Sequence, residues 1–196
     1  MKATLRRREV ARRLLEKRGK LLVVAGLGST AWDVTAAGDS PLSFPLWGAM
    51  GQAAMIGLGL ALAQPRRRVL VITGDGEMLM GLGSLATIGV QKPANLSVVV
   101  IDNERYGETG MQATHTAAGV DLAKVAQACG FKVARQVRNA GQLAALRAAI
   151  YRPSGPLFAQ VKVVPEKIPL VLPPRDGGFL KSRFRKALLG DSADLD

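Results

Sequence analysis

Two short polar segments, each placed directly after an apolar run, carry residues whose types suit metal and phosphate chemistry. Gly74-Asp75-Gly76 follows the β-branched run 69–73, and Asn103 with Asp102 before it follows the run 96–101. The helical pattern between the two runs predicts a strand–helix–strand unit with parallel strands. The right-handed crossover of such a unit brings the carboxyl ends of both strands to one edge of the sheet. We therefore expect Asp75 and Asn103 to lie side by side.

The expected pairing of Asp75 and Asn103 has a definite chemical use. A carboxylate, an amide oxygen and a main-chain carbonyl are hard oxygen ligands that suit Mg²⁺. The helix that begins after Gly76 would point its first N–H groups at the same place, which favours a phosphate group. The two segments together predict a site for a divalent cation and a diphosphate.

A second glycine-rich loop, Gly26-Leu27-Gly28-Ser29-Thr30, follows the short apolar run 21–25. Small residues allow the backbone to approach a ligand, and a hydroxyl can donate to a phosphate. The same residues also form ordinary tight turns between a strand and a helix. The pattern alone leaves both interpretations open.

The rest of the chain alternates between the two kinds of pattern. Apolar runs that predict strands lie at 21–25, 69–73, 96–101, 131–137 and 157–164. Helical patterns lie at 3–18, 52–63, 78–90, 122–129 and 140–151, whereas 31–45 reads as a loop with about one helical turn. This alternation predicts an α/β fold: a doubly wound, mainly parallel sheet with helices on both faces.

The length of 196 residues suits one folded domain with flanking segments. We expect a basic helix at 1–20, a ligand-binding α/β domain at 21–164, and an extended basic arm at 165–196. Four prolines open the arm, and the pattern at 179–189 predicts a short basic helix within it. The arm has no obvious place in the domain core, so we expect it to lie on a partner.

The chain carries 27 Lys and Arg residues against 15 Asp and Glu, a net charge of +12 that is concentrated at its two ends. Such a charge suits an acidic partner, a solvated face, an anionic substrate or nucleic acid. No nucleic-acid-binding module accompanies it, and aromatic residues make up only 5% of the chain, which disfavours nucleic acid. No apolar run approaches the roughly 20 residues of a membrane span, so we expect a cytoplasmic protein without membrane contact.

The string GDGEMLMGLGSLATIG, followed by NLSVVVIDNERYGETGMQATHT, resembles the diphosphate-binding motif of thiamine-diphosphate enzymes. In its full length it looks like the β subunit, or the C-terminal half, of the sulfopyruvate and phosphonopyruvate decarboxylase group. The resemblance implies thiamine diphosphate and Mg²⁺ as cofactors. It also implies decarboxylation of a small anionic 2-oxo acid to an aldehyde and CO₂.

The resemblance assigns roles to individual residues. Asp75, Asn103 and the main-chain carbonyl of Arg105 would hold Mg²⁺. Ser29 would meet the diphosphate through its hydroxyl, in line with the family's first strand loop. Glu77 stands where serine is common, and its charge would repel a diphosphate unless Mg²⁺ intervened or the side chain turned outward. We therefore expect only the backbone N–H of Glu77 to be used.

Further residues would contact the organic part of the cofactor. Met50, between two glycines, would wedge under the cofactor and hold its two rings in a bent shape, while the Gly48 carbonyl would accept from the exocyclic amine. Polar candidates for the reacting end are Glu108, Thr109 and His115, the single histidine of the chain. The remaining expected cofactor contacts are Gly28, Gly74, Gly76, Tyr106 and Gly107.

One essential part of the family's site has no counterpart in this sequence. The glutamate that acts on the pyrimidine ring belongs to a separate domain, and nothing here matches that domain. The resemblance therefore implies an α subunit with the pyrimidine-binding domain, a higher hetero-oligomer, and no activity of this chain alone. Two alternatives stay open: a carboligase similar to acetolactate synthase, and a non-enzymatic basic scaffold or polyanion-binding subunit.

Overall fold

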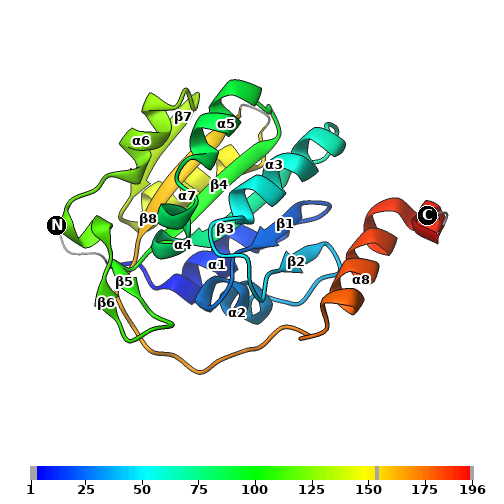
Figure 1. Cartoon of the computed structure of the whole chain (residues 1–196), viewed down its shortest axis with the longest axis horizontal. Helices are drawn as coiled ribbons and strands as arrows, with labels where there is room; N and C mark the ends of the chain where they lie inside the picture. Colours follow the sequence, from blue (N-terminus) through cyan, green and yellow to red (C-terminus); the bar gives the residue numbers. More distant parts are fainter. Residues whose placement is uncertain (1–3, 153–154, 195–196) are drawn as a thin grey trace.

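The computed structural model describes residues 4–152 and 155–194. Its centre is a six-stranded sheet in which every neighbouring pair is parallel, with the order β2-β1-β3-β4-β8-β7 (Figure 1). The strands are β1 (Leu22–Ala25), β2 (Ser43–Pro45), β3 (Val69–Gly74), β4 (Leu96–Asp102), β7 (Val133–Val137) and β8 (Leu157–Lys162). The doubly wound α/β fold expected from the sequence is confirmed.

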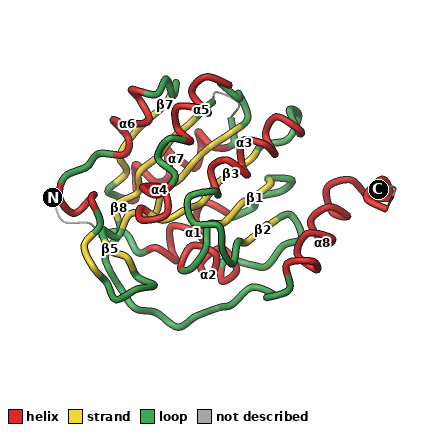
Figure 2. The backbone as a smooth tube through the Cα atoms, in the orientation of Figure 1, coloured by secondary structure: helices red, strands yellow, loops and turns green. Residues whose placement is uncertain are grey.

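Helices cover both faces of this sheet (Figure 2). One hydrophobic cluster joins the sheet to α1 (Arg7–Leu15), α2 (Ser29–Ala36) and α7 (Ala140–Ile150). The other cluster joins it to α3 (Ala53–Ala63), α4 (Asp75–Met80), α5 (Ser84–Gln91) and α6 (Leu122–Ala128). Because the central strands are buried on both faces, they need nearly continuous Val, Ile and Leu, which explains the apolar runs.

The order of the strands creates a crevice at one position of the sheet. β1 lies between β2 and β3, so the chain first adds a strand on one side of β1 and later on the other. The helices that follow β1 and β3, α2 and α4, accordingly pack on opposite faces. Their divergence leaves a crevice outside the carboxyl ends of β1 and β3, where ligands bind in such folds.

The prediction of one continuous helix over 78–90 is wrong. The structure divides it into α4, which ends at Met80, and α5, which begins at Ser84. Between them Gly81 packs so closely on the backbone of Gly51 that no side chain would fit. This contact between distant segments interrupts a stretch whose local pattern favours one helix.

The predicted loop 31–45 is also wrong, since it contains most of α2 and all of β2. Ala31 and Val34 of α2 are buried against the sheet, and this packing stabilises a helix with two β-branched threonines. β2 includes Pro45 and lies at the edge of the sheet. An edge position tolerates proline because one side of the strand needs no N–H donor.

The N-terminal helix is shorter than the predicted range 3–18. α1 spans Arg7–Leu15, while Leu5 forms a parallel β-bridge with Val163. Residues 1–3 of the predicted N-terminal segment lie outside the described residues. α1 packs against α2 and α7 and buries Val10 and Leu14, so this segment is part of the domain core.

After β4 a small hairpin, β5 (Arg105–Tyr106) with β6 (Gln112–Ala113), leads into the 3-10 helix η1 (His115–Ala118). After β8 the chain runs extended to α8 (Gly177–Leu189) and the 3-10 helix η2 (Gly190–Asp194). Residues 195–196 of the predicted arm lie outside the described part of the chain. No helix in the described ranges is long and apolar enough to cross a membrane.

The expectation that the C-terminal arm has no place in the core is wrong for α8. Phe184 is buried and its ring lies 5.6 Å from that of Phe44 in β2, while Leu180 is buried as well. On the way to α8, the indole N–H of Trp47 donates to the carbonyl of Pro174 at 2.7 Å. The arm therefore returns to its own domain through α8.

The two phenylalanines of α8 allow a matched test of this docking. Phe184 is 8% exposed and Phe179 is 51% exposed. We predict that Phe184→Ala lowers the free energy of unfolding by about 3 kcal/mol, because it leaves a cavity in the core. Phe179→Ala should change it by less than about 0.5 kcal/mol. Urea unfolding of both variants measures the difference, and equal effects would contradict the docking of α8.

Candidate functional site

A cleft opens at the crevice between β1 and β3 and is bounded by the loops that follow three strands. Ser29 comes from the loop after β1, the segment 74–77 follows β3, and Asn103 follows β4. The hairpin β5–β6 contributes Tyr106 to the same cleft. The structure therefore brings together the two glycine loops and the Asn103 segment that the sequence singled out.

Asp75 and Asn103 lie in contact at the base of the cleft. Asp75 is the first residue of α4 and is buried, and the backbone N–H of Asn103 donates to its carboxylate. The side-chain oxygen of Asn103 accepts from the backbone N–H of Arg105 at 2.9 Å. The predicted adjacency of Asp75 and Asn103 follows from the parallel register of β3 and β4.

The carboxylate of Asp75 is buried without a positive partner. Burial raises the pKa of Asp75 to about 6, the nearby charge of Asp102 adds to the rise, and hydrogen bonds from Thr114 and the backbone oppose it. Its side-chain partners are the hydroxyls of Thr114, at 2.6 Å, and Thr116, at 3.4 Å. Because neither hydroxyl carries charge, this position favours a bound cation.

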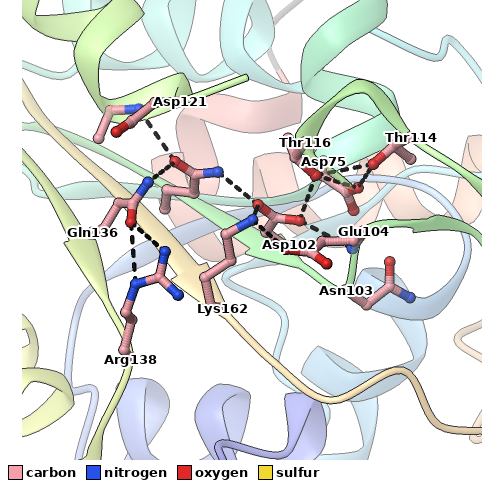
Figure 3. A network of polar contacts seen from close by, with 12 residues as sticks. Asp75, Asp102, Asn103, Glu104, Thr114, Thr116, Asp121, Gln136, Arg138 and Lys162 are labelled. Carbon is pink, nitrogen blue, oxygen red and sulfur yellow. Dashed lines mark hydrogen bonds and ion pairs between the residues drawn. The ribbon is translucent and has the colours of Figure 1, made fainter. Parts of the chain in front are cut away.

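A chain of polar contacts connects Asp75 to the end of the sheet (Figure 3). Thr116 donates to Asp102 at 2.8 Å, and the ammonium group of Lys162 lies 2.7 Å from the same carboxylate. Gln160 also donates to Asp102 at 2.6 Å. Asp102 is thus fully engaged at the sheet end by Thr116, Lys162 and Gln160.

Thr114 and Thr116 are site residues that the sequence reasoning missed. Both are buried, whereas His115 between them is exposed and lies outside the cleft. In the motif Thr-His-Thr the histidine is the more obvious candidate for chemistry, because imidazole can act as an acid, a base or a ligand. The signal that could have identified the threonines is their alternation on either side of an exposed residue.

The loop after β1 presents the Ser29 hydroxyl and the first backbone N–H groups of α2 to the cleft. Gly28 adopts a left-handed conformation with φ +70° before α2 begins at Ser29, and no side chain caps the helix. The Thr30 hydroxyl is bonded to the carbonyl of Gly26 at 2.7 Å. Within the described chain the Ser29 hydroxyl has no hydrogen-bond partner. The first N–H groups of α2 and the Ser29 hydroxyl can therefore bind an anion.

Glu77 differs from the expectation in the direction of its side chain. The carboxyl turns inward, accepts a hydrogen bond from Thr73 at 2.6 Å, and lies directly under Gly26, where a side chain would collide with it. Burial raises the pKa of Glu77, while the Thr73 hydroxyl and backbone N–H groups oppose the rise. Of the two ways considered for this carboxyl to avoid a diphosphate, an outward turn is excluded, and the use of the Glu77 backbone N–H stays a prediction.

Arg7, from α1, is a second cleft residue that the sequence reasoning missed. Its guanidinium donates to the carbonyl of Ser29 at 3.1 Å and to Asp33 at 2.5 Å. Arg8 donates to the other oxygen of Asp33 at 3.1 Å. Two guanidinium groups share this one carboxylate, and the charge of Arg7 also acts on the Glu108 carboxyl in the same cleft. An arginine-rich helix reads as solvated, so only the packing of α1 on α2 shows this role.

The other expected residues divide by their place in the cleft. Met50 reaches the lining and is 38% exposed, while Gly48 and His115 do not line the cleft. Gly28 adjoins it, since a side chain there would meet the carboxyl of Glu108. Burial raises the pKa of Glu108, and the charge of Arg7 opposes this. The expected residues on the lining are Ser29, Met50, Gly74, Asp75, Gly76, Glu77, Asn103, Arg105, Tyr106, Gly107, Glu108 and Thr109.

No group of three or more His, Cys, Asp and Glu residues suited to a metal occurs within residues 4–152 and 155–194. A cation in this cleft would therefore depend on one carboxylate together with amide and carbonyl oxygens. Asp75, Asn103 and the backbone after Asn103 offer that donor set, which suits Mg²⁺ better than a soft transition metal.

Comparison with known proteins places these observations in a family. Residues 28–161 match the family described as thiamine pyrophosphate enzyme, C-terminal TPP binding domain. Over 173 residues the chain is 40% identical to sulfopyruvate decarboxylase subunit beta of Methanothermobacter thermautotrophicus, covering 88% of this chain and 90% of that protein.

Two further relatives extend the comparison. The chain is 39% identical to phosphonopyruvate decarboxylase of Streptomyces viridochromogenes, over 73% of this chain but 36% of that protein. The crystal structure of benzoylformate decarboxylase from Polynucleobacter necessarius is similar in fold, with a TM-score of 0.69 and 21% identity over 85% of this chain and 34% of the other.

The buried Asp102–Lys162 pair below the cleft can be tested by its energetics. We predict that Lys162→Met lowers the free energy of unfolding by about 3 kcal/mol, because Asp102 is left buried without its cation. The double variant Asp102→Asn/Lys162→Met removes both charges and should recover most of that loss. Urea unfolding of the three proteins measures this, and a double variant less stable than Lys162→Met would contradict the pairing.

Proposed function

This chain belongs to the thiamine pyrophosphate enzyme family, as a C-terminal TPP-binding domain, and from this premise we propose that it acts as the β subunit of a two-subunit decarboxylase. Its substrate would be an anionic 2-oxo acid. The observation that carries the proposal is the buried Asp75–Asn103 pair at the crevice of the sheet, in a chain that matches a β subunit along almost its whole length.

The residues of the cleft fit a Mg²⁺ ion with a diphosphate. We assign Mg²⁺ to the Asp75 carboxylate, the Asn103 side-chain oxygen and the Arg105 carbonyl. The lack of a positive partner for the buried Asp75 supports this assignment, since a divalent cation would stabilise its charged form. The threonines at 114 and 116 hold the carboxylate in place without neutralising it.

We assign the diphosphate to the donors on the other side of the crevice. The Ser29 hydroxyl and the first N–H groups of α2 face it from one strand loop, and the backbone N–H groups of Gly76 and Glu77 from the next. Arg7 adds a cation that is bonded to the Ser29 carbonyl, next to these donors. The Glu77 carboxyl turns inward and accepts a hydrogen bond from Thr73.

Thiamine diphosphate supplies, when bound, the electron sink that the loss of CO₂ from a 2-oxo acid requires. We assign Met50, which lines the cleft, to support the cofactor, and the Gly48 carbonyl, outside the lining, to accept from its exocyclic amine. The pyrimidine end would be completed by the α subunit, because the chain matches only the C-terminal domain of the family. The active site would then lie at the interface of the two subunits.

The substrate's anionic character rests on the relatives, whose names specify sulfopyruvate and phosphonopyruvate. Both acids carry a second anionic group beyond the carboxylate. Glu108 and Thr109 line the cleft on the hairpin side and remain our candidates at the reacting end. His115 is exposed outside the cleft and would reach the substrate only across the interface with the α subunit.

The proposal is tested by product analysis with the chain and its α partner mixed in the presence of Mg²⁺ and thiamine diphosphate. We predict that sulfopyruvate or phosphonopyruvate yields one aldehyde for each CO₂, and that pyruvate reacts more slowly. Asn103→Ala should lower the rate by at least about 100-fold, because a misplaced metal misaligns the reactants. Gln127→Ala, an amide removed on the exposed face of α6, is the matched control and should leave the rate unchanged.

Other outcomes would redirect the assignment. One product molecule built from two 2-oxo acids for each CO₂ would indicate carboligation in place of simple decarboxylation. Release of CO₂ by the chain without any partner would contradict the split site.

A further inference from the structure

A second pocket lies at the amino ends of the strands, on the opposite edge of the sheet from the cleft. Its walls come from the segments before β1, β3 and β4, and Figure 1 shows these loops at the far end of the sheet from α4 and β5. The pocket has a volume of about 300 Å³. Five cationic side chains line it: Arg18, Lys20, Arg66, Arg67 and Arg68.

We call this site the basic pocket. Hydrogen bonds to neutral groups hold its framework in a defined geometry. The side-chain amide of Asn95 donates to three backbone carbonyls, of residues 61, 64 and 67, and so fixes the turn that carries the arginines. Arg67 donates to the carbonyl of Lys20 at 2.9 Å, which ties this turn to the segment before β1. Arg18 donates to Ser43 at 2.7 Å and to two backbone carbonyls. These bonds orient the guanidinium groups without neutralising them.

The positive charge of the basic pocket exceeds what the surrounding protein offsets. No carboxylate among the described residues lines it, and Asp39, the carboxylate whose charge acts on Arg18, is itself paired with Arg183. The C-terminal ends of α1, α3 and α7 point to this edge and contribute about half a negative charge each. The three helix ends together contribute a charge of about −1.5, which leaves a large excess of positive charge from the five cationic side chains. In the described chain, Lys20, Arg66 and Arg68 have no side-chain hydrogen bond or ion pair.

We propose that the basic pocket binds a small multivalent phosphate compound, such as a polyphosphate or the phosphate chain of a nucleotide. Its volume is in the range of pockets for small ligands, and converging guanidinium groups suit phosphate oxygens through charge-assisted hydrogen bonds. Single-stranded nucleic acid fits less well, because it needs aromatic platforms for its bases. Tyr151 is the one aromatic residue that lines the pocket, and Arg147 already covers its ring at 5.2 Å.

The proposal is independent of the function proposed for the cleft, since the two sites share no lining residue. It gives part of the net charge of +12 a local role, because five of the 27 Lys and Arg residues line one concave site. The experiment uses the full chain in metal-free buffer with inorganic tripolyphosphate as the probe. Omitting metal removes the cation expected to anchor a diphosphate in the cleft, and variants of the basic pocket identify which site holds the probe.

Isothermal titration compares the unchanged chain with two double variants that remove the same charge. Arg66→Gln/Arg68→Gln changes two pocket arginines whose side chains make no hydrogen bond or ion pair within the described structure, so folding is preserved. Lys124→Gln/Lys132→Gln removes two exposed cations outside the pocket. We expect one tripolyphosphate per chain, a dissociation constant raised at least about tenfold in the pocket variant, and a change within about twofold in the control.

Each alternative result would overturn the proposal. No saturable binding would exclude the site, and equal weakening by both double variants would show attraction by diffuse charge. Tighter binding of a single-stranded RNA than of tripolyphosphate, lost in the pocket variant, would identify a nucleic-acid surface.

Discussion

The arrangement of this protein depends on the buried carboxylate of Asp75, for which the described residues supply no positive partner. Asp75 lies at the carboxyl end of β3, where the sheet's connections diverge, and its neighbours supply hydroxyl and amide hydrogen bonds but no charge. A buried carboxylate without a cation is costly. The protein retains it at the point where the doubly wound fold opens a crevice, which is the position at which a bound divalent cation would offset that cost.

The surrounding structure holds this carboxylate through neutral groups. Thr114 donates to Asp75 and lies 2.9 Å from Thr116, which donates to Asp102. The charge of Asp102 is offset by Lys162, so the two carboxylates share a network but only Asp102 has a cation among the described residues. The Glu77 carboxyl is turned beneath Gly26 and bonded to Thr73. Across the crevice, Arg7 and the start of α2 present positive groups. A cation on one side and anion donors on the other suit a metal–diphosphate pair.

The sequence predicted the parts of this site that follow from chain connectivity. Parallel strands with a right-handed crossover must bring Asp75 and Asn103 together, and the glycine loop before Ser29 must open at the same edge. Arg7, Thr114 and Thr116 could not be found in this way, because their positions depend on how separate segments pack. The same reason explains the break between α4 and α5, which a contact with Gly51 imposes. His115 was expected at the reacting end, but it begins the 3-10 helix η1 with its side chain exposed, while Thr114 and Thr116 on either side are buried.

The central claim is that this chain holds the metal and diphosphate end of a cofactor whose other end is bound by a second subunit. Isothermal titration of thiamine diphosphate tests it most directly, with this chain, its α partner and their mixture, each with and without Mg²⁺. We predict that thiamine diphosphate binds tightly only to the mixture and only with Mg²⁺, and that it does not bind when the chain carries Asp75→Ala. Metal-independent binding, or the absence of binding in the mixture, would contradict it.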